Sequence, residues 1–438
     1  MNRSLNFETA DSKAESKSNS KAESKSNSKA ESKSNSKAES KSNSKAESKS
    51  NSKAESKSNS KAESKSNSKA ESKSNLKADS KSNSKSDLKS DSKTCLMSVS
   101  ESYDFEIDTI FEKIKDLESQ KKPVAVGLQF PEGLKKHGFS IASQIKKTTG
   151  AEVYISADPC FGACDLDTKL IEYTDILFHF GHAPLNQGLV ENKVCFIEMR
   201  SKADVLNAVR AALPLLTESS VGLLTTVQHV HQLEKAKEEL EKAGKKVVIA
   251  AGDKRLAYPG QILGCNFSAA HSKDSKNCDV FLYIGSGRFH PIGIAVSSKK
   301  RVVCADPFTS EAFELNNRQL LMQRSAVIGN STDAEVFGIL VSVKNGQCRK
   351  KLAQSLKEKA KAHGKKAYLL LMDLVTPDQM LSFKADAFIN TACPRLSIDD
   401  SGLFPAPVLT PQEFEIVIGE RDWEDWVMDE ILEGGQDE

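Results

Sequence analysis

Short apolar runs alternate with longer amphipathic stretches along most of the chain after residue 100. The apolar runs are continuous, which is typical of strands in parallel sheets that helices cover on both faces. The stretches between them include segments with the 3.6-residue periodicity of helices, of which the clearest are 105–117, 134–147, 233–243 and 348–363. The predicted strands form three groups of four: 124–130, 152–157, 176–181 and 194–199; 221–226, 246–251, 280–285 and 301–305; and 336–343, 367–372, 387–391 and 408–409.

Three groups of strands joined through helices predict an α/β protein with three similar small parallel-sheet domains. We place these domains at 101–215, 216–330 and 331–438. The 338 residues after the first hundred are more than one ordinary core supports, which agrees with several domains.

The first 100 residues differ in kind from the rest. The octamer Ser-Lys-Ala-Glu-Ser-Lys-Ser-Asn is repeated eight times over 12–75, and it has no aromatic or branched apolar side chain to bury. Such a segment cannot offset the entropy of ordering, so we predict a disordered repeat tail over 1–100. The tail carries 22 basic and 13 acidic side chains, a formal charge of +9, whereas the remaining residues carry 40 and 47, a charge of −7.

Charge and hydropathy exclude some classes of function. Low-complexity basic runs are more often solvating extensions than RNA-binding arms, so we expect no direct nucleic-acid role. No apolar run approaches the roughly 20 residues that span a bilayer, and no secretory apolar region follows the first residues. We therefore expect a cytoplasmic protein without a membrane segment. Its nine cysteines are widely spread, which in a reducing compartment favours metal ligation, catalysis or free thiols over disulfides.

Three cysteines stand out because each lies in a turn marked by Gly or Pro shortly after a predicted strand. Cys164 ends Asp-Pro-Cys-Phe-Gly-Ala-Cys, Cys265 follows Pro-Gly-Gln-Ile-Leu-Gly, and Cys393 precedes Pro394. Ligands of open α/β sheets bind in such loops, and each predicted domain contributes one of these thiols. Single cysteines from three separate segments suit a metal or cluster at a junction between domains better than a local zinc knuckle.

Other cysteines and the histidines offer competing ligands. Cys160 forms Cys-x3-Cys with Cys164 and could be half of a zinc site. His182 and His290 are the better histidine candidates, because Gly and Pro neighbours place them in loops at strand ends. For His179 and His231 a structural role is equally expected. The remaining cysteines lack marked turns and are expected in the core, on the surface or in the tail: Cys95, Cys195, Cys278, Cys304 and Cys348.

Taken in order, six motifs resemble those of the 2-(3-amino-3-carboxypropyl)histidine synthases of diphthamide biosynthesis, in their archaeal form. The resemblance covers 124–414, so the repeat tail lies outside it. The motifs are Gln-Phe-Pro-Glu-Gly-Leu at 129–134, Asp-Pro-Cys-Phe-Gly-Ala-Cys-Asp at 158–165, Pro-Gly-Gln-Ile-Leu-Gly-Cys at 259–265, Gly-Arg-Phe-His-Pro at 287–291, Gly-Ile-Leu-Val-Ser-Val-Lys-Asn-Gly-Gln at 338–347 and Cys-Pro-Arg-Leu-Ser-Ile-Asp-Asp at 393–400.

This resemblance implies a pseudo-threefold arrangement of the three domains, a homodimer, and a [4Fe-4S] cluster held by Cys164, Cys265 and Cys393 with its fourth iron open. It also implies non-canonical radical chemistry, in which the reduced cluster gives one electron to S-adenosylmethionine. The 3-amino-3-carboxypropyl group is then joined to the imidazole C2 of a histidine on translation elongation factor 2, and methylthioadenosine is released. An electron donor is a further implied partner.

Polar residues at predicted strand ends are candidates to contact S-adenosylmethionine, and an Arg or a loop amide among them would pair with the methionine carboxylate. The candidates are Gln129, His182, Gln228, Arg288 and His290. No catalytic residue beyond the cluster ligands is predicted.

Two other kinds of protein stay open at this point. A quinolinate synthase-like dehydratase also places one cluster cysteine on each of three α/β domains, although it does not share the six motifs. A non-catalytic zinc protein would use Cys160 together with Cys164, Cys265 and Cys393 as four ligands, and it would need no reductant.

Overall fold

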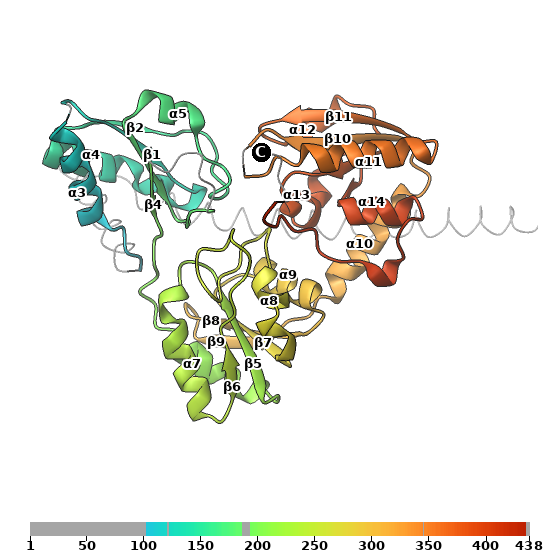
Figure 1. The fold of residues 1–438 in the computed structure, drawn as a ribbon, viewed down its shortest axis with the longest axis horizontal. Helices are drawn as coiled ribbons and strands as arrows, with labels where there is room; N and C mark the ends of the chain where they lie inside the picture. Colours follow the sequence, from blue (N-terminus) through green and yellow to red (C-terminus); the bar gives the residue numbers. More distant parts are fainter. Residues whose placement is uncertain (1–101, 121, 186–192, 345, 435–438) are drawn as a thin grey trace, which may run out of the picture. The chain divides into compact units, whose positions relative to one another are not determined.

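The computed structural model describes residues 102–120, 122–185, 193–344 and 346–434. The described strands form three separate sheets, each flanked by its own helices (Figure 1). The predicted α/β class with parallel sheets is therefore confirmed. The tail predicted at 1–100 lies outside the described residues, and the domain limits that we placed by sequence stay a prediction. Among the described helices, none is long and apolar enough to cross a membrane.

The first sheet has the strand order β2-β1-β3-β4 with every pair parallel. Its central strands β1 and β3 are almost entirely buried, as continuous apolar runs require. The stacked rings of Phe130 and Phe180, with centroids 4.4 Å apart, close the core beyond the ends of these two strands. The elements are α3 (Ile107–Glu118), β1 (Ala125–Gln129), η2 (Glu132–His137), α4 (Gly138–Thr149), β2 (Glu152–Ile155), α5 (Thr168–Tyr173), β3 (Ile176–Phe180) and β4 (Val194–Ile197).

The second sheet has the order β6-β5-β7-β8-β9. Its first four strands are parallel, whereas β9 pairs antiparallel with β8. The sequence pattern did not predict β9, because Glu-Ala-Phe-Glu has charged ends and only two apolar positions. The elements are α6 (Leu206–Ala212), η3 (Leu213–Leu215), β5 (Ser220–Thr225), η4 (Val230–Gln232), α7 (Leu233–Lys242), β6 (Lys246–Val248), α8 (Ser268–His271), η5 (Asp274–Asn277), β7 (Val280–Ile284), α9 (Phe289–Ser298), β8 (Arg301–Asp306) and β9 (Glu311–Glu314).

The third sheet has the order β11-β10-β12-β13, again with parallel pairs throughout. Two of its helices begin with a capping box at Thr376 and Thr410, each followed by proline at the first helical position. The elements are α10 (Arg318–Ser331), β10 (Val336–Ser342), α11 (Lys350–Ala362), β11 (Lys366–Met372), α12 (Pro377–Leu381), β12 (Ala387–Asn390), α13 (Pro394–Ile398), η6 (Ser401–Leu403), β13 (Val408–Leu409), α14 (Pro411–Val417) and η7 (Trp423–Asp425).

All three sheets begin with the same topology, in which the first strand lies between the second and the third. Because the strands are parallel, the loops that leave their carboxyl ends gather at one edge of each sheet. Cys164 follows β2, Cys265 follows β6, and Cys393 follows β12. Each sheet therefore offers one cysteine at the edge where ligands of such sheets bind.

A fully buried ion pair holds the third sheet to its helices. Arg324 of α10 donates from Nε to Glu413 of α14 over 2.7 Å, and both side chains are inaccessible to solvent. The same guanidinium donates to the carbonyl oxygens of Ser397 and Val408. Glu413 also accepts from the indole nitrogen of Trp426 over 3.1 Å. Every charged group in this network is paired, which is the condition for burying it.

Close packing beside the Cys265 loop leaves no room for a side chain at Gly293. A Cβ on Gly293 of α9 would lie 1.9 Å from Cζ of Phe267, a fully buried ring two residues after Cys265. We expect Gly293→Ala to destabilise the protein by about 1–3 kcal/mol, since overpacking forces neighbouring groups to shift. Thermal and urea unfolding would measure the change.

Gly329 of α10 is the matched control, because a Cβ there would meet no atom within 4 Å. Gly329→Ala is expected to stabilise the protein by about 0.5–1 kcal/mol, the usual gain for alanine within a helix. Equal effects of the two substitutions would contradict the packing seen around Phe267.

Candidate functional site

The loop that carries Cys164 packs against the segment after β10. The Sγ atom of Cys164 accepts a hydrogen bond from Nε2 of Gln347 over 3.2 Å. A Cβ on Gly346 would lie 2.3 Å from the Cβ of Cys164, so only glycine allows this approach. Lys344 of the same segment forms a 2.6 Å ion pair with Asp165, and both side chains are largely buried. The first and third sheets therefore meet at Cys164.

The Cys265 loop is held by a segment that we call the C-terminal strap, residues 426–433. The backbone nitrogen of Ile431 donates to the carbonyl oxygen of Cys265 over 2.7 Å. Nδ2 of Asn266 donates to the carbonyl oxygen of Ile431 over 3.1 Å, and the backbone nitrogen of Phe267 donates to Glu430 over 2.7 Å. The second cysteine thus depends on residues more than 160 positions further along the chain.

The same strap fixes the Cys393 loop through Arg349. This buried guanidinium donates to both carboxylate oxygens of Asp429, over 2.9 and 2.7 Å. It also donates to the carbonyl oxygens of Thr391 and Ala392, which directly precede Cys393. Arg349 therefore ties the third cysteine loop to the strap that holds the second.

The three thiols influence one another's pKa values, which indicates that they lie close together. Burial and, less strongly, the neighbouring Cys164 raise the pKa of Cys265 to about 12. Burial also raises the pKa of Cys393, with added contributions from both of the other thiols. Charge at one position is felt at the others only over short distances in a poorly screened interior. The three sheets thus deliver their cysteines to one shared centre.

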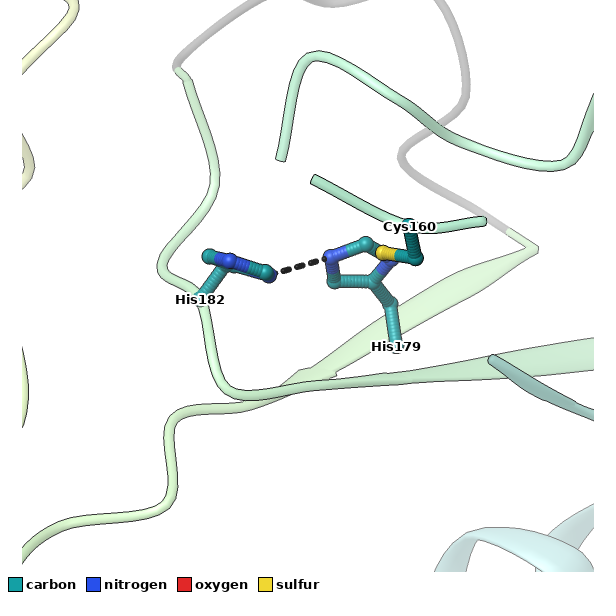
Figure 2. A group of neighbouring side chains, drawn as sticks. All are labelled: Cys160, His179 and His182. Atoms are coloured by element: carbon teal, nitrogen blue, oxygen red, sulfur yellow. Dashed lines mark hydrogen bonds between the residues drawn. The ribbon is translucent and has the colours of Figure 1, made fainter. Parts of the chain in front are cut away.

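One set of three candidate metal ligands whose ligand atoms lie within 4.8 Å of one another occurs among the described residues, and it consists of Cys160, His179 and His182 (Figure 2). Cys164, Cys265 and Cys393 are not members of this set.

A buried arginine supplies positive charge to the cysteine centre. Arg255 is only 3% exposed, and its charge partly offsets the burial that raises the pKa of Cys164 and Cys265. Its Nη2 donates to the carbonyl oxygen of Gly346 over 3.2 Å. Its Nε and Nη1 are buried without a nitrogen or oxygen acceptor among the described residues, and the guanidinium faces the Cys265 sulfur. Unpaired buried N–H groups are costly, so these donors fit an anionic group held by the thiols.

A cavity of about 520 Å³ is lined by residues that follow strands of the first and second sheets. His182 on its wall belongs to the trio with Cys160, four residues before Cys164. His290, on the wall as well, lies near Arg395, two residues after Cys393; burial and, less strongly, this cation lower the pKa of His290 to about 4. The volume is in the range of small-molecule sites. Residues that line the cavity include Leu134, His137, Gly181, His182, Met199, Gln228, His229, Tyr283, Ser286, His290 and Phe308.

The structure brings together three of the five residues predicted to contact S-adenosylmethionine, since His182, Gln228 and His290 all line the cavity. Gln129 and Arg288 do not belong to the lining. Gln129 is buried behind His182 with its amide engaged by the chain itself, and Arg288 lies over the ring of Phe313 at 5.2 Å.

Two further histidines of the cavity were not among the residues predicted to contact S-adenosylmethionine. His137 Nε2 and His229 Nδ1 are buried without a hydrogen-bond partner among the described residues. Burial lowers the pKa of His229 to about 4, so its ring is neutral. A ligand or water in the cavity would satisfy such atoms. His137 is followed by Gly138, but it lies eight residues after the end of β1, and only the packing of η2 against the cavity reveals it.

Three parallel α/β sheets that each deliver one cysteine to a common buried centre, beside a cavity, define a class of protein built around a shared metal cluster. Comparison with known proteins agrees. Residues 130–427 match the family model of the diphthamide synthesis proteins. The chain belongs to the diphthamide synthesis protein family, as its motifs predicted.

Individual relatives give the same result. The 2-(3-amino-3-carboxypropyl)histidine synthase of Pyrococcus horikoshii is 36% identical over 312 residues, which are 70% of this chain and 89% of the relative. Subunit 1 of the human enzyme of that name is 28% identical over 335 residues, 74% of each chain. The crystal structure of Dph2 from P. horikoshii with a 4Fe-4S cluster is similar with a TM-score of 0.69 and 34% identity, covering 75% of this chain and 94% of the other.

Proposed function

We propose that this protein transfers the 3-amino-3-carboxypropyl group of S-adenosylmethionine to the imidazole C2 of a histidine on translation elongation factor 2. This is the first step of diphthamide biosynthesis. The observation that carries the proposal is the shared centre of Cys164, Cys265 and Cys393 beside a cavity of substrate size. The names of the relatives and the six motifs support the same reaction.

The three cysteines hold a [4Fe-4S] cluster in this proposal. Their thiols are neutral before binding, because burial raises their pKa values, so loading the cluster releases protons. Gln347 then donates to the Cys164 sulfur, and Arg255 offsets the negative charge of the group. When bound, the cluster supplies one electron that cleaves the bond between sulfur and the γ-carbon of S-adenosylmethionine.

The cavity residues bind and orient the substrates. Burial lowers the pKa values of His182, His229 and His290 to about 4, so these rings carry no charge near neutral pH. These neutral imidazoles do not repel the sulfonium cation, aromatic rings such as Phe308 attract it, and the one cationic side chain among the described residues of the lining is that of Lys136. The cavity wall, built from loops of the first and second sheets, shields a bound substrate from water and so protects a reactive fragment from side reactions.

The proposal extends to partners and location. We infer that the protein works in the cytoplasm, where translation elongation factor 2 is its protein substrate. It acts as a homodimer and receives electrons from a separate donor. Retention of one cysteine per sheet supports a chain that is catalytic without a second, different subunit.

Anaerobic purification of the full chain tests the proposed function. About four irons per chain, with matching sulfide and a reduced-cluster EPR signal after dithionite, are expected. Addition of S-adenosylmethionine and elongation factor 2 should release methylthioadenosine and increase the mass of one histidine on the factor. Zinc without iron would instead establish the non-catalytic zinc protein. An intact cluster without methylthioadenosine release would favour the quinolinate synthase-like reaction.

The role given to Arg255 leads to a separate prediction. Arg255→Gln should lower the midpoint potential of the cluster by about 60 mV, because losing one charge-assisted contact of about 1.4 kcal/mol favours the less negative, oxidised state. Arg255→Lys keeps the charge and should shift the potential less. Potentiometric EPR titration measures both variants. A potential unchanged in Arg255→Gln would show that this cation does not face the cluster.

A further inference from the structure

A chain of hydrogen bonds runs from the backbone of the Cys164 loop to the wall of the cavity. Gln129, at the end of β1, donates from Nε2 to the carbonyl oxygen of Asp165 over 2.7 Å. Its Oε1 accepts from the backbone nitrogen of Asp167 over 3.2 Å. The backbone thus fixes which end of the Gln129 amide is oxygen, a choice that side-chain contacts alone often leave open.

The orientation of Gln129 decides the tautomer of His179. Nδ1 of His179 lies 2.9 Å from Oε1 of Gln129. Because that oxygen can only accept, Nδ1 must carry the proton, and a neutral imidazole then has a lone pair at Nε2. Burial keeps His179 neutral by lowering its pKa well below the usual value.

The tautomer of His179 in turn decides that of His182. Nε2 of His179 lies 2.9 Å from Nδ1 of His182, the contact drawn in Figure 2. Since Nε2 of His179 accepts, Nδ1 of His182 must donate, and the lone pair of His182 is at its Nε2. Gly181, with φ of 84°, provides the turn after β3 that folds His182 back over His179.

The lone pair of His182 is directed away from this chain. The two nitrogens of an imidazole ring point in nearly opposite directions, so Nε2 faces away from His179. His182 also forms a hydrogen bond with the backbone of Phe180, and its Nε2 is not among the buried atoms that lack a partner. Because His182 lines the cavity, its ring can be reached by a bound substrate.

We propose that His182, through Nε2, accepts the proton that leaves C2 of the target histidine when the new carbon–carbon bond forms. This rests on the proposed function. Overall, the S–Cγ bond of the sulfonium breaks, the Cγ–C2 bond forms and the C2–H bond is lost. The electron that cleaves the S–Cγ bond is given back when the proton leaves C2, and the proton carries away the positive charge that the sulfonium had, so the net change needs no oxidant.

The hydrogen bonds from His182 to His179 and from His179 to Gln129 stabilise the positive charge that His182 gains with the proton. After Nε2 takes the proton, Nδ1–H still donates to His179, whose own Nδ1–H donates to Gln129. Positive charge is thereby shared between two imidazoles and ends at an oriented carbonyl oxygen. His229 and His290, the other imidazoles of the cavity with pKa values near 4, have no such chain of hydrogen bonds among the described residues: Nδ1 of His229 has no partner there, and His290 lies near the cation of Arg395. His179 and Gln129 are positioning residues in this scheme.

A substitution that removes only the basic atom gives the sharpest test. His182→Asn keeps an N–H near the position of Nδ1, which can still donate to His179, but has no atom equivalent to Nε2. In the cluster-loaded enzyme we expect methylthioadenosine release to fall less than about threefold. Modified elongation factor 2 formed per methylthioadenosine should fall about a hundredfold, the usual contribution of a general base. His363→Asn, at the end of α11, is the matched control and should keep the wild-type ratio.

The failures of the two proposals are distinguishable. If the wild-type enzyme releases no methylthioadenosine, the proposed function fails. If the wild type is active and His182→Asn keeps one modification per methylthioadenosine, only the role of His182 is overturned. Circular dichroism and the EPR signal of the cluster establish that the variant is folded and loaded.

Histidine tautomers give a second readout that does not depend on activity. In the full chain labelled with ¹⁵N-histidine, NMR should find both His179 and His182 protonated at Nδ1 and unprotonated at Nε2. A proton on Nε2 of either ring would overturn the inference. So would zinc bound in the purified chain and lost on Cys160→Ser with iron unchanged, because the trio with Cys160 would then hold a metal in place of the shared proton.

Discussion

Replacing any one of Cys164, Cys265 and Cys393 by serine is expected to lower cluster occupancy and transferase activity by about a hundredfold or more. Loss of an outer contact to a metal ligand already costs about 10–100-fold, and loss of the ligand itself costs at least as much. Each thiol comes from a different sheet, so no neighbouring cysteine of the same loop can replace Cys265 or Cys393. Iron content and methylthioadenosine release would measure the effect.

Cys160→Ser is the matched control for these three variants. Cys160 shares its loop with Cys164 but lies with His179 and His182, and burial raises its pKa to about 12. We expect this variant to keep its iron and most of its activity. Iron loss in Cys160→Ser together with iron retention in Cys265→Ser would contradict the assignment and favour a local site in the Cys164 loop.

Glu413→Ala should destabilise the protein by about 3–5 kcal/mol, the cost of leaving a buried charge without its partner. Arg324 would keep its contacts to the carbonyl oxygens of Ser397 and Val408 but lose its only carboxylate among the described residues. Trp426 would also lose the acceptor of its indole N–H. The midpoint of urea unfolding, with cluster content recorded in parallel, measures the change.

A double variant separates the ion pair from simple packing. Arg324→Met combined with Glu413→Leu removes both charges and retains apolar volume, so it should be less destabilising than Glu413→Ala alone. The unfolding free energies of Arg324→Met, Glu413→Leu and the double variant would give the coupling energy between the two residues. If the double variant loses as much as both singles together, the pair acts only by filling space.

The fold could be predicted from sequence wherever burial leaves a continuous apolar run. All twelve predicted strands occur, with ends shifted by a few residues at most, because strands such as Val280–Ile284 are buried on both faces. β9 was not predicted, because it lies at a sheet edge and none of its side chains is fully buried. α10 was not among the clearest periodic stretches, and it uses the charged Arg324 where an apolar residue would be expected.

The site was predictable only in part, for a related reason. Cys164, Cys265 and Cys393 are marked locally by Gly and Pro turns, so their sequence context distinguishes them. Arg255 and the pair of Arg349 with Asp429 have no local mark, since their importance arises from partners 80 or more residues away. Gln129 shows what sequence alone does not reveal. Its motif can be read in the sequence, but its hydrogen bond to His179 depends on the folded backbone.

The C-terminal strap must be synthesised before the surroundings of the three cysteines are complete. Residues 429–431 hold the Cys265 and Cys393 loops, yet they are synthesised 266 positions after Cys164. At about 5–20 residues per second, the first thiol waits roughly 13–53 s on the ribosome before the segment that completes its surroundings exists. Cluster insertion is therefore a post-translational event, and a chain that terminates before the strap yields a thiol-bearing protein that cannot mature.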